Sequence, residues 1–402
     1  MRVLLVHNRY KNQGGESLVA KAEMDLIESH GHAVDLLEAD NAEIAGFAEK
    51  LKAALAAPYS AKTKRRMAAQ IATSRPDVVH VHNFFPLLSP SIYYACSEAG
   101  VPVVQTLHNY RLICPSSLLF RSGLPCEDCV GKTFAWPGVL HACYRDSRLG
   151  TASVAAMAST HHWLGTWHSR IDCFIALTDF SRRKLIEGGL PADKIVVKPN
   201  FALDPGGLNH GKGRFALFAG RLSSEKGIAT LLSAWDHSNG PPLRLKVAGD
   251  GPLREDVVRS ATAGHIEYLG VLSRKSVQAL MCKAAFLVFP SICYENFPLS
   301  IVDAFASGLP VVASRLGAMA EIVQDGRTGL HFTPGDARDL AAKVEWARTH
   351  PKEMEEMSCA ARAEYEERYT AERNYQQLTE AYGRVIAGRG APRNFATGLK
   401  KA

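Results

Sequence analysis

The sequence lacks the features that would place it in several common classes of protein. No apolar run reaches the roughly 18–20 residues of a membrane-spanning helix. The short apolar run 3–6 is followed by His7 and Asn8 rather than by a cleavage site, unlike a signal peptide. We therefore expect a cytoplasmic chain. There is also no G-x-G-x-x-G after the first apolar run and no G-x-x-x-x-G-K-[ST], which disfavours a simple dehydrogenase and a P-loop NTPase.

Acidic residues are missing from one stretch of the chain. Residues 50–75 contain seven basic side chains and no acidic one, and the whole chain has a formal net charge of +7, so the remainder is neutral. The seven are Lys50, Lys52, Lys62, Lys64, Arg65, Arg66 and Arg75. Apolar residues alternate with them, which is typical of a basic amphipathic helix docked on an anionic membrane, here the inner face of the plasma membrane. A solvated helix face would have the same pattern. No nucleic-acid-binding motif accompanies the charge, so no nucleic-acid partner is expected.

The chain of 402 residues is long enough for about two or three domains. Short apolar runs alternate with helical stretches in each half, which predicts parallel sheets built from βαβ units. The predicted strands are 2–7, 33–37, 78–81, 101–107, 174–177 and 194–197 in the first half, and 215–219, 243–248, 266–269, 286–289 and 310–313 in the second.

The fold class that follows is α/β, with two doubly wound, Rossmann-like domains facing each other across a cleft. We predict a first domain over 1–198 with a cysteine-rich insertion at 110–145, and a Pro/Gly-rich linker over 199–213. The second domain covers 214–365. A helix over 366–387 packs back on the first domain, and 388–402 form a disordered tail.

Two segments of the second half carry candidate binding residues. Arg221 and Lys226 follow a predicted strand and precede a helix, where an arginine fork and a lysine charge suit a diphosphate; a solvated loop is the alternative. Glu295 lies just before a helix that Pro298 begins, and Asp303 lies within it. Paired carboxylates would bind the hydroxyls of a sugar and a ribose, and the free backbone N–H groups of Leu299 and Ser300 would bind a phosphate.

With these segments the chain resembles the retaining, GT-B-fold glycosyltransferases of the large family-four group. Gly-Arg-Leu…Glu-Lys-Gly, Val-Ala-Gly-Asp-Gly-Pro, Glu-Asn-Phe-Pro-Leu-Ser-Ile-Val-Asp-Ala-Phe and Asp-Gly-Arg-Thr-Gly-Leu occur in the family's order. The resemblance implies that Arg221 and Lys226 bind the donor diphosphate and that Glu295 contacts the transferred sugar. It also implies donor contacts from Phe297. The ribose-binding residue is usually Glu in the family, and here it is the shorter Asp303.

The first half resembles a subgroup of the same family. Gly14 and Gly15 match a glycine loop that approaches the donor phosphates, where backbone must come close to the ligand; an ordinary turn is the alternative. His82 and His108 each follow a predicted strand. His108 matches the family's active-site histidine, whereas we expect His82 to shape the acceptor side or to satisfy a hydrogen bond in the core.

The implied reaction is transfer of a sugar from a UDP-, GDP- or ADP-sugar to a glycan or lipid-linked acceptor. Such transfer builds surface polysaccharides or glycolipids, lipopolysaccharide and exopolysaccharide among them. No Asp-x-Asp metal motif matches, so we expect no cofactor to be required, because Arg221 and Lys226 take the place of a metal. The alternatives are an epimerase or hydrolase on the same scaffold and a non-catalytic nucleotide-sugar-binding protein.

Four of the nine cysteines form a separate pattern. Cys114, Cys126, Cys129 and Cys143 are separated by eleven, two and thirteen residues within the insertion. This spacing fits a tetrahedral thiolate site for a structural zinc ion. Four reduced thiols packing the loop, or a redox-active pair, are the alternatives.

Overall fold

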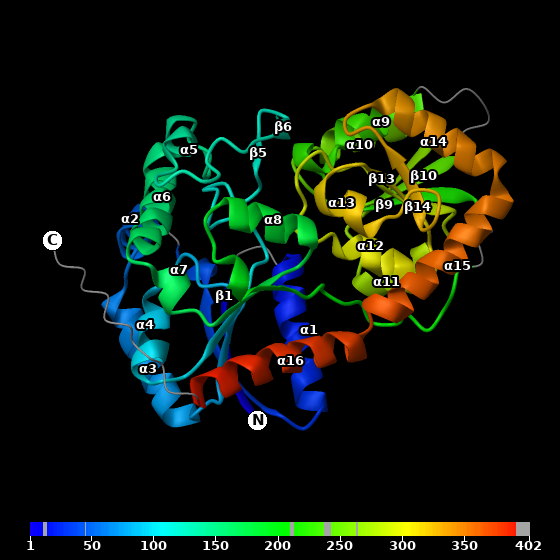
Figure 1. The fold of residues 1–402 in the computed structure, drawn as a ribbon. Coiled ribbons are helices and arrows are strands. Elements are labelled where there is room, and N and C mark those ends of the chain that lie inside the picture. Colours follow the sequence, from blue (N-terminus) through cyan, green and yellow to red (C-terminus); the bar gives the residue numbers. More distant parts are fainter. Residues whose placement is uncertain (11–13, 45, 210–212, 237–242, 263, 391–402) are drawn as a thin grey trace.

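The computed structural model describes residues 1–10, 14–44, 46–209, 213–236, 243–262 and 264–390. Two α/β domains lie side by side in it (Figure 1). Each contains a six-stranded parallel sheet, and the core strands are nearly fully buried, as expected for Val- and Ile-rich strands covered by helices on both faces. All the strands predicted from the sequence are present, with ends moved by three residues at most.

The first sheet has the strand order β2-β1-β3-β4-β7-β8. Its strands are β1 (Arg2–Arg9), β2 (Ala33–Asp40), β3 (Val78–Val81), β4 (Val103–Thr106), β7 (Cys173–Ala176) and β8 (Ile195–Val197). The helices around it are α1 (Gly15–Ser29), α2 (Phe47–Ala56), α3 (Ala61–Ser74), α4 (Ser91–Glu98), α6 (Arg148–Trp163), α7 (Thr166–Ser169) and α8 (Asp179–Glu187).

The second sheet has the order β11-β10-β9-β12-β13-β14, which is the 3-2-1-4-5-6 order of dinucleotide-binding folds. Its strands are β9 (Phe215–Ala219), β10 (Arg244–Ala248), β11 (Ile266–Gly270), β12 (Phe286–Phe289), β13 (Val311–Ser314) and β14 (Gly329–Phe332), of which β14 is not predicted from the sequence. Its helices are α9 (Ile228–Asp236), α10 (Arg254–Ala261), α11 (Arg274–Met281), α12 (Leu299–Ala306), α13 (Gly317–Ile322), α14 (Ala337–Thr349) and α15 (Pro351–Arg368).

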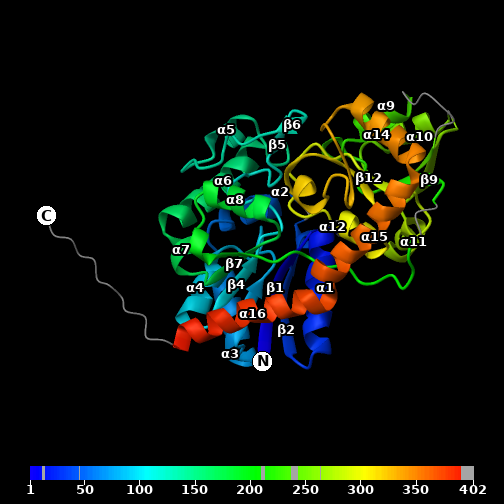
Figure 2. The same cartoon turned by 45° about the vertical axis from the view of Figure 1, so that its right-hand side comes forward.

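The last helix, α16 (Ala371–Gly390), returns to the first domain, as the sequence predicts (Figure 2). The Tyr382 hydroxyl lies 2.7 Å from Nδ1 of His80, and the Tyr375 ring stacks on His30 with 3.6 Å between centroids. The expected bounds of the last helix and of the C-terminal tail are wrong in detail. The helix expected over 366–387 is interrupted between Arg368 and Ala371, and residues 388–390 are helical rather than part of the tail; 391–402 lie outside the described residues.

The basic stretch forms two helices, α2 and α3, and not the one helix expected, because Pro58 lies between them. Two of its seven cations are engaged within the protein. Lys64 pairs with Glu98 at 2.6 Å, and Arg66 donates to the Glu38 carbonyl at 2.8 Å. No helix among the described residues has the length and hydrophobicity needed to cross a membrane.

Candidate active site

The two loops with the candidate donor-binding residues meet at the switch point of the second sheet. The strand order reverses between the adjacent strands β9 and β12, which is where open α/β sheets bind ligands. Lys226 follows β9, and its Nζ lies 2.6 Å from Oε1 of Glu295, which follows β12. A Cβ on Gly227, where φ is +69°, would lie 1.9 Å from the Pro290 carbonyl oxygen. Only glycine therefore allows these two loops to approach so closely.

The Lys226–Glu295 pair keeps a charged lysine at the edge of the sheet. The Ser291 hydroxyl donates to the same Glu295 oxygen at 2.6 Å, which fixes the carboxylate. Burial lowers the pKa of Lys226, but the neighbouring Glu295, Cys293 and Glu225 together outweigh burial, and the pKa of Lys226 is raised overall. In the same loop Arg221 is exposed, and its guanidinium forms no ion pair or hydrogen bond with a described residue. Both cations can therefore face an anionic ligand.

The helix that follows Glu295 presents unsatisfied backbone donors. α12 begins after Pro298, which is the N-cap rather than the first helical residue expected. No side chain caps the helix, and within the described structure the N–H groups of Leu299 and Ser300 have no partner. Phe297 contributes packing instead, since its ring lies 6.2 Å from that of Tyr369. The free N–H groups are therefore the feature of this segment that is suited to an anionic ligand.

Asp303 is held by a partner that the sequence does not reveal. Arg274, at the start of α11, places Nη2 2.7 Å from Oδ1 of Asp303. Burial raises the pKa of Asp303, although the Arg274 charge and hydrogen bond act in the opposite direction. The carboxylate keeps a free oxygen for a ligand, and Arg274 fixes its orientation.

The glycine loop of the first domain meets α12 of the second. Gly14 is the N-cap of α1 and has no capping side chain. A Cβ on Gly15 would lie 3.1 Å from Cδ1 of Leu299. The N-termini of α1 and α12 therefore point to one place at the domain boundary (Figure 2). Two positive helix ends at one place favour an anion. The sequence predicts the free N–H groups of α12, whereas for Gly14 and Gly15 it predicts only a loop that approaches the ligand.

Two histidines, the buried His82 and the partly buried His108, form a pair behind this place. Nδ1 of His82 lies 2.9 Å from Nε2 of His108, while Nε2 of His82 faces Oε2 of Glu23 at 3.5 Å. The other Glu23 oxygen pairs with the buried Lys198 at 2.5 Å. Burial is the main cause that lowers the pKa of His108 to about 3, so the ring is neutral at ordinary pH. Of the two roles expected for His82, the structure favours the core hydrogen bond, which here supports His108.

Glu16 is a candidate that the sequence argument missed. It follows the two glycines, its side chain is 10% exposed, and Asn109, the neighbour of His108, donates to its Oε2 at 3.3 Å. Burial raises the pKa of Glu16 to about 8. Oε1 is buried without a hydrogen bond and faces Nδ1 of His7 at 3.9 Å. A carboxyl group directly after a glycine pair, in the first turn of the helix, is the signal that could have found it.

Direct contacts join the two domains around the site. Asn296 donates to the Leu107 carbonyl, next to His108, at 2.5 Å. The Glu321 carboxylate accepts from the backbone N–H groups of Asp179 and Phe180 at 2.8 and 2.7 Å and so caps α8. Glu321 and α8 are separated by about 140 residues in the sequence, so this cap belongs to the closed arrangement of the domains.

Two Rossmann-like domains with their switch points turned to one charged site define the GT-B fold. Solved structures agree: the Anabaena protein HepE, solved with UDP-glucose, has a TM-score of 0.65 at 18% identity and covers 96% of this chain and 100% of that one. The sucrose-phosphate synthase of Thermosynechococcus elongatus has a TM-score of 0.69 at 17% identity, with 96% and 99% covered.

The sequence comparisons support a glycosyltransferase of this fold. Residues 23–202 match the family model Glycosyltransferase Family 4, and residues 213–349 match Glycosyl transferases group 1. Sulfoquinovosyl transferase SQD2 of Arabidopsis thaliana is 24% identical over 78% of this chain and 57% of its own length. Glycogen synthase of Mycobacterium tuberculosis is 25% identical over 77% of this chain and 68% of its own length. The chain thus spans little more than half to two thirds of these relatives.

Proposed function

We propose that this chain is a retaining glycosyltransferase that moves a sugar from a nucleotide-sugar donor to a glycan or lipid-linked acceptor. The observation that carries the proposal is the Lys226–Glu295 pair at the meeting point of two uncapped helix N-termini. Lys226, Arg221 and the N–H groups of α12 would stabilise the departing diphosphate, whose negative charge grows as its bond to the sugar breaks. Glu295 would accept hydrogen bonds from the transferred sugar, and Asp303 from the ribose.

Retention requires attack on the face that the nucleotide leaves. The bond from the anomeric carbon to the diphosphate oxygen breaks, and the bond to the acceptor oxygen forms on the same side. The acceptor proton passes to the departing phosphate oxygen, so no protein base is consumed. The neutral ring of His108 can hydrogen-bond a sugar hydroxyl beside this carbon, and contact between the domains excludes water that would hydrolyse the donor.

Glu16 is the residue that we assign to the acceptor. Its carboxyl group lies on the first domain, next to the glycine loop, with the side chain 10% exposed, and it can form a hydrogen bond with an acceptor hydroxyl. Glu16→Gln should raise the KM for the acceptor and leave the Kd for the nucleotide unchanged. An equal weakening of acceptor and nucleotide binding would assign Glu16 to the donor site instead.

The basic helices are the proposed docking face for a membrane that carries the acceptor. Lys62 and Arg65 are exposed on α3, and Leu55 on α2 is 74% exposed. Neutralising Lys62 and Arg65 to Gln should abolish salt-sensitive binding to anionic vesicles. The matched control is the same change at Lys64 and Arg66, which already have partners within the protein. Equal effects of the two double variants would contradict a specific docking face.

The first experiment is transfer from labelled nucleotide sugars, beginning with UDP-glucose because HepE was solved with it. Label should move only when an acceptor is present, and NMR of the product should show the donor's anomeric configuration. Conversion of the donor without an acceptor would favour an epimerase or hydrolase, and an inverted product would refute retention.

A further inference from the structure

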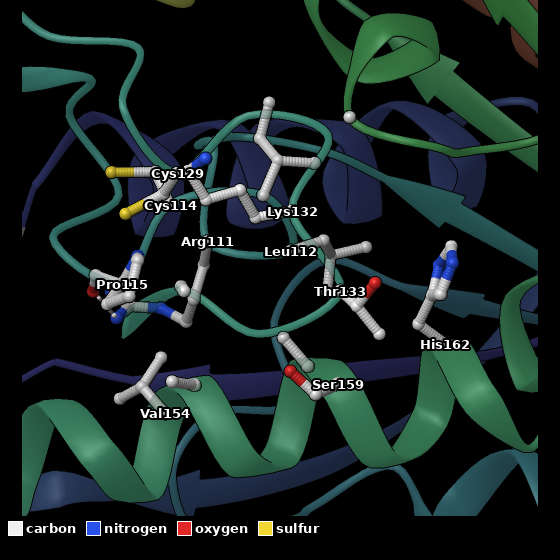
Figure 3. A pocket seen from close by; sticks show the side chains of 15 residues that line it. Arg111, Leu112, Cys114, Pro115, Cys129, Lys132, Thr133, Val154, Ser159 and His162 are labelled. Carbon is white, nitrogen blue, oxygen red and sulfur yellow. Dashed lines mark hydrogen bonds between the residues drawn. The ribbon is translucent and has the colours of Figure 1, made fainter. Parts of the chain in front are cut away.

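The cysteine-rich insertion brings its four cysteines to one cavity. Cys114, Cys126, Cys129 and Cys143 line it together with Arg121 and Gly138. Cys114 and Cys129, which also border a neighbouring pocket against α6, turn their sulfur atoms to the same side (Figure 3). All four are free thiols, none in a disulfide. Cysteines up to 29 positions apart in the sequence therefore lie around one cavity. Packing of the loop alone would not require all four residues there to be cysteines.

The insertion has little else to hold it in shape. Its regular structure is limited to a hairpin of two-residue strands, β5 (Phe120–Arg121) and β6 (Leu124–Pro125), and the five-residue helix α5 (Trp136–Leu140). Many of its large apolar side chains face solvent rather than a core. These are Leu118, Leu124, Phe134, Trp136 and Leu140, which are between 42% and 69% exposed.

The backbone of the same segment is strained. Of the eight non-glycine residues with positive φ in the described structure, six lie between 117 and 146. They are Ser117, Leu119, Ser122, Ala142, Arg145 and Asp146. Each such residue costs roughly 1–2 kcal/mol. A segment with this cost and few buried apolar anchors needs a cross-link to keep one conformation.

We propose that Cys114, Cys126, Cys129 and Cys143 bind one zinc ion as a tetrahedral, structural site. The sulfur atoms are more widely spaced than in a filled site. In the described structure, the group of potential ligands whose donor atoms all lie within 4.8 Å of one another is Glu23, His80 and His82. Lys198 already neutralises that carboxylate, so a second cation is disfavoured there. Zinc would draw the four sulfurs to about 2.3 Å from one centre.

Binding exchanges four thiol protons for one metal ion, so no oxidant or reductant is involved. Four thiolates leave no open coordination position, and the role is therefore structural rather than catalytic. The site lies in the first domain. Arg111, at the base of the insertion, lies over the ring of Phe85 at 4.6 Å and over that of Tyr144, which follows Cys143, at 5.5 Å.

The test is metal analysis of the full chain purified without added zinc or chelator. We expect about one zinc per chain, released as the four thiols react with an organomercurial. Replacing zinc by Co²⁺ should give the intense visible bands of tetrahedral cobalt with thiolate ligands. Zinc below about 0.1 per chain with four freely reactive thiols, or a Cys126–Cys129 disulfide by mass spectrometry, would overturn the proposal.

Variants separate this site from adventitious metal. Cys126→Ser and Cys129→Ser should each lose the zinc and the cobalt bands, whereas Cys359→Ser, an exposed cysteine on α15, should keep both. If the first two variants fail to fold, the metal analysis and the cobalt spectrum of the unmodified chain still decide whether the four cysteines bind zinc. Zinc retained by Cys129→Ser in full stoichiometry would place the metal elsewhere.

Discussion

Replacing Lys226 by alanine should weaken the binding of UDP far more than the binding of uridine. The ammonium lies 2.6 Å from Glu295 beside the free N–H groups of α12, where a diphosphate would replace the carboxylate as its partner. A hydrogen bond to a charged group contributes about 1.5–3 kcal/mol. That corresponds to a loss of about 10- to 150-fold in UDP affinity, with little change for uridine, which has no phosphate.

The partner of Lys226 supplies a prediction of opposite sign. Glu295→Gln removes a negative charge from the same ammonium, so UDP should bind equally well or up to about fivefold more tightly, the equivalent of about 1 kcal/mol. Sugar transfer should still fall, because the carboxylate is needed for the sugar and not for the diphosphate.

Isothermal titration calorimetry at fixed ionic strength measures both effects, and Lys352→Ala, an exposed lysine of α15, is the control for a lost charge. An unchanged ratio of UDP to uridine affinity in Lys226→Ala would show that this lysine does not bind the diphosphate. If Glu295→Gln weakened the binding of UDP as much as Lys226→Ala does, the assignment of Lys226 to the diphosphate and Glu295 to the sugar would be wrong.

Three further outcomes follow from the described contacts. Gly15→Val should leave the melting temperature nearly unchanged but reduce kcat/KM, because the new side chain would collide with Leu299 and hold the two domains apart. Unchanged activity would show that catalysis does not need contact between α1 and α12. Lys198→Met should lower the free energy of unfolding, measured with urea, by about 3–5 kcal/mol, because the buried Glu23 loses its cationic partner and keeps only the neutral His82 nearby. A loss below about 1 kcal/mol would contradict this pairing. The free energy of unfolding should fall as the pH is lowered from 6.5 towards 3, because His108 takes up a proton in the unfolded state but stays neutral in the folded state until about pH 3. Urea unfolding of His108→Asn should show a shallower fall. An identical pH profile for the variant and the unmodified chain would refute this role of His108.

Local patterns predict the strands and the two loops with Lys226 and Glu295. A strand buried on both faces is a short apolar run, and a loop residue is recognised because it directly follows such a run. The partners of the site residues are not predictable in this way. Arg274 meets Asp303 only because α11 and α12 pack side by side. Glu23, on a helix that reads as an ordinary amphipathic one, is fully buried because it pairs with Lys198, 175 residues away. Periodicity tells which residues point inward, but not which residue of another element they will meet.

The position of the positive charge implies that donor binding and domain closure are coupled. Lys226, Arg221 and α12 belong to the second domain, whereas the N-terminus of α1 belongs to the first, and Gly15 touches Leu299 only when the two are in contact. A diphosphate at this boundary would be stabilised by both helix ends at once, and an open form would lose the roughly 0.3–1 kcal/mol that the N-terminus of α1 contributes. The ligand therefore favours the closed form by that difference in free energy. Closure in turn brings Asn296 to the end of β4 and Glu321 to α8. The same charges that we propose for the leaving group can thus bring these contacts between the two domains together.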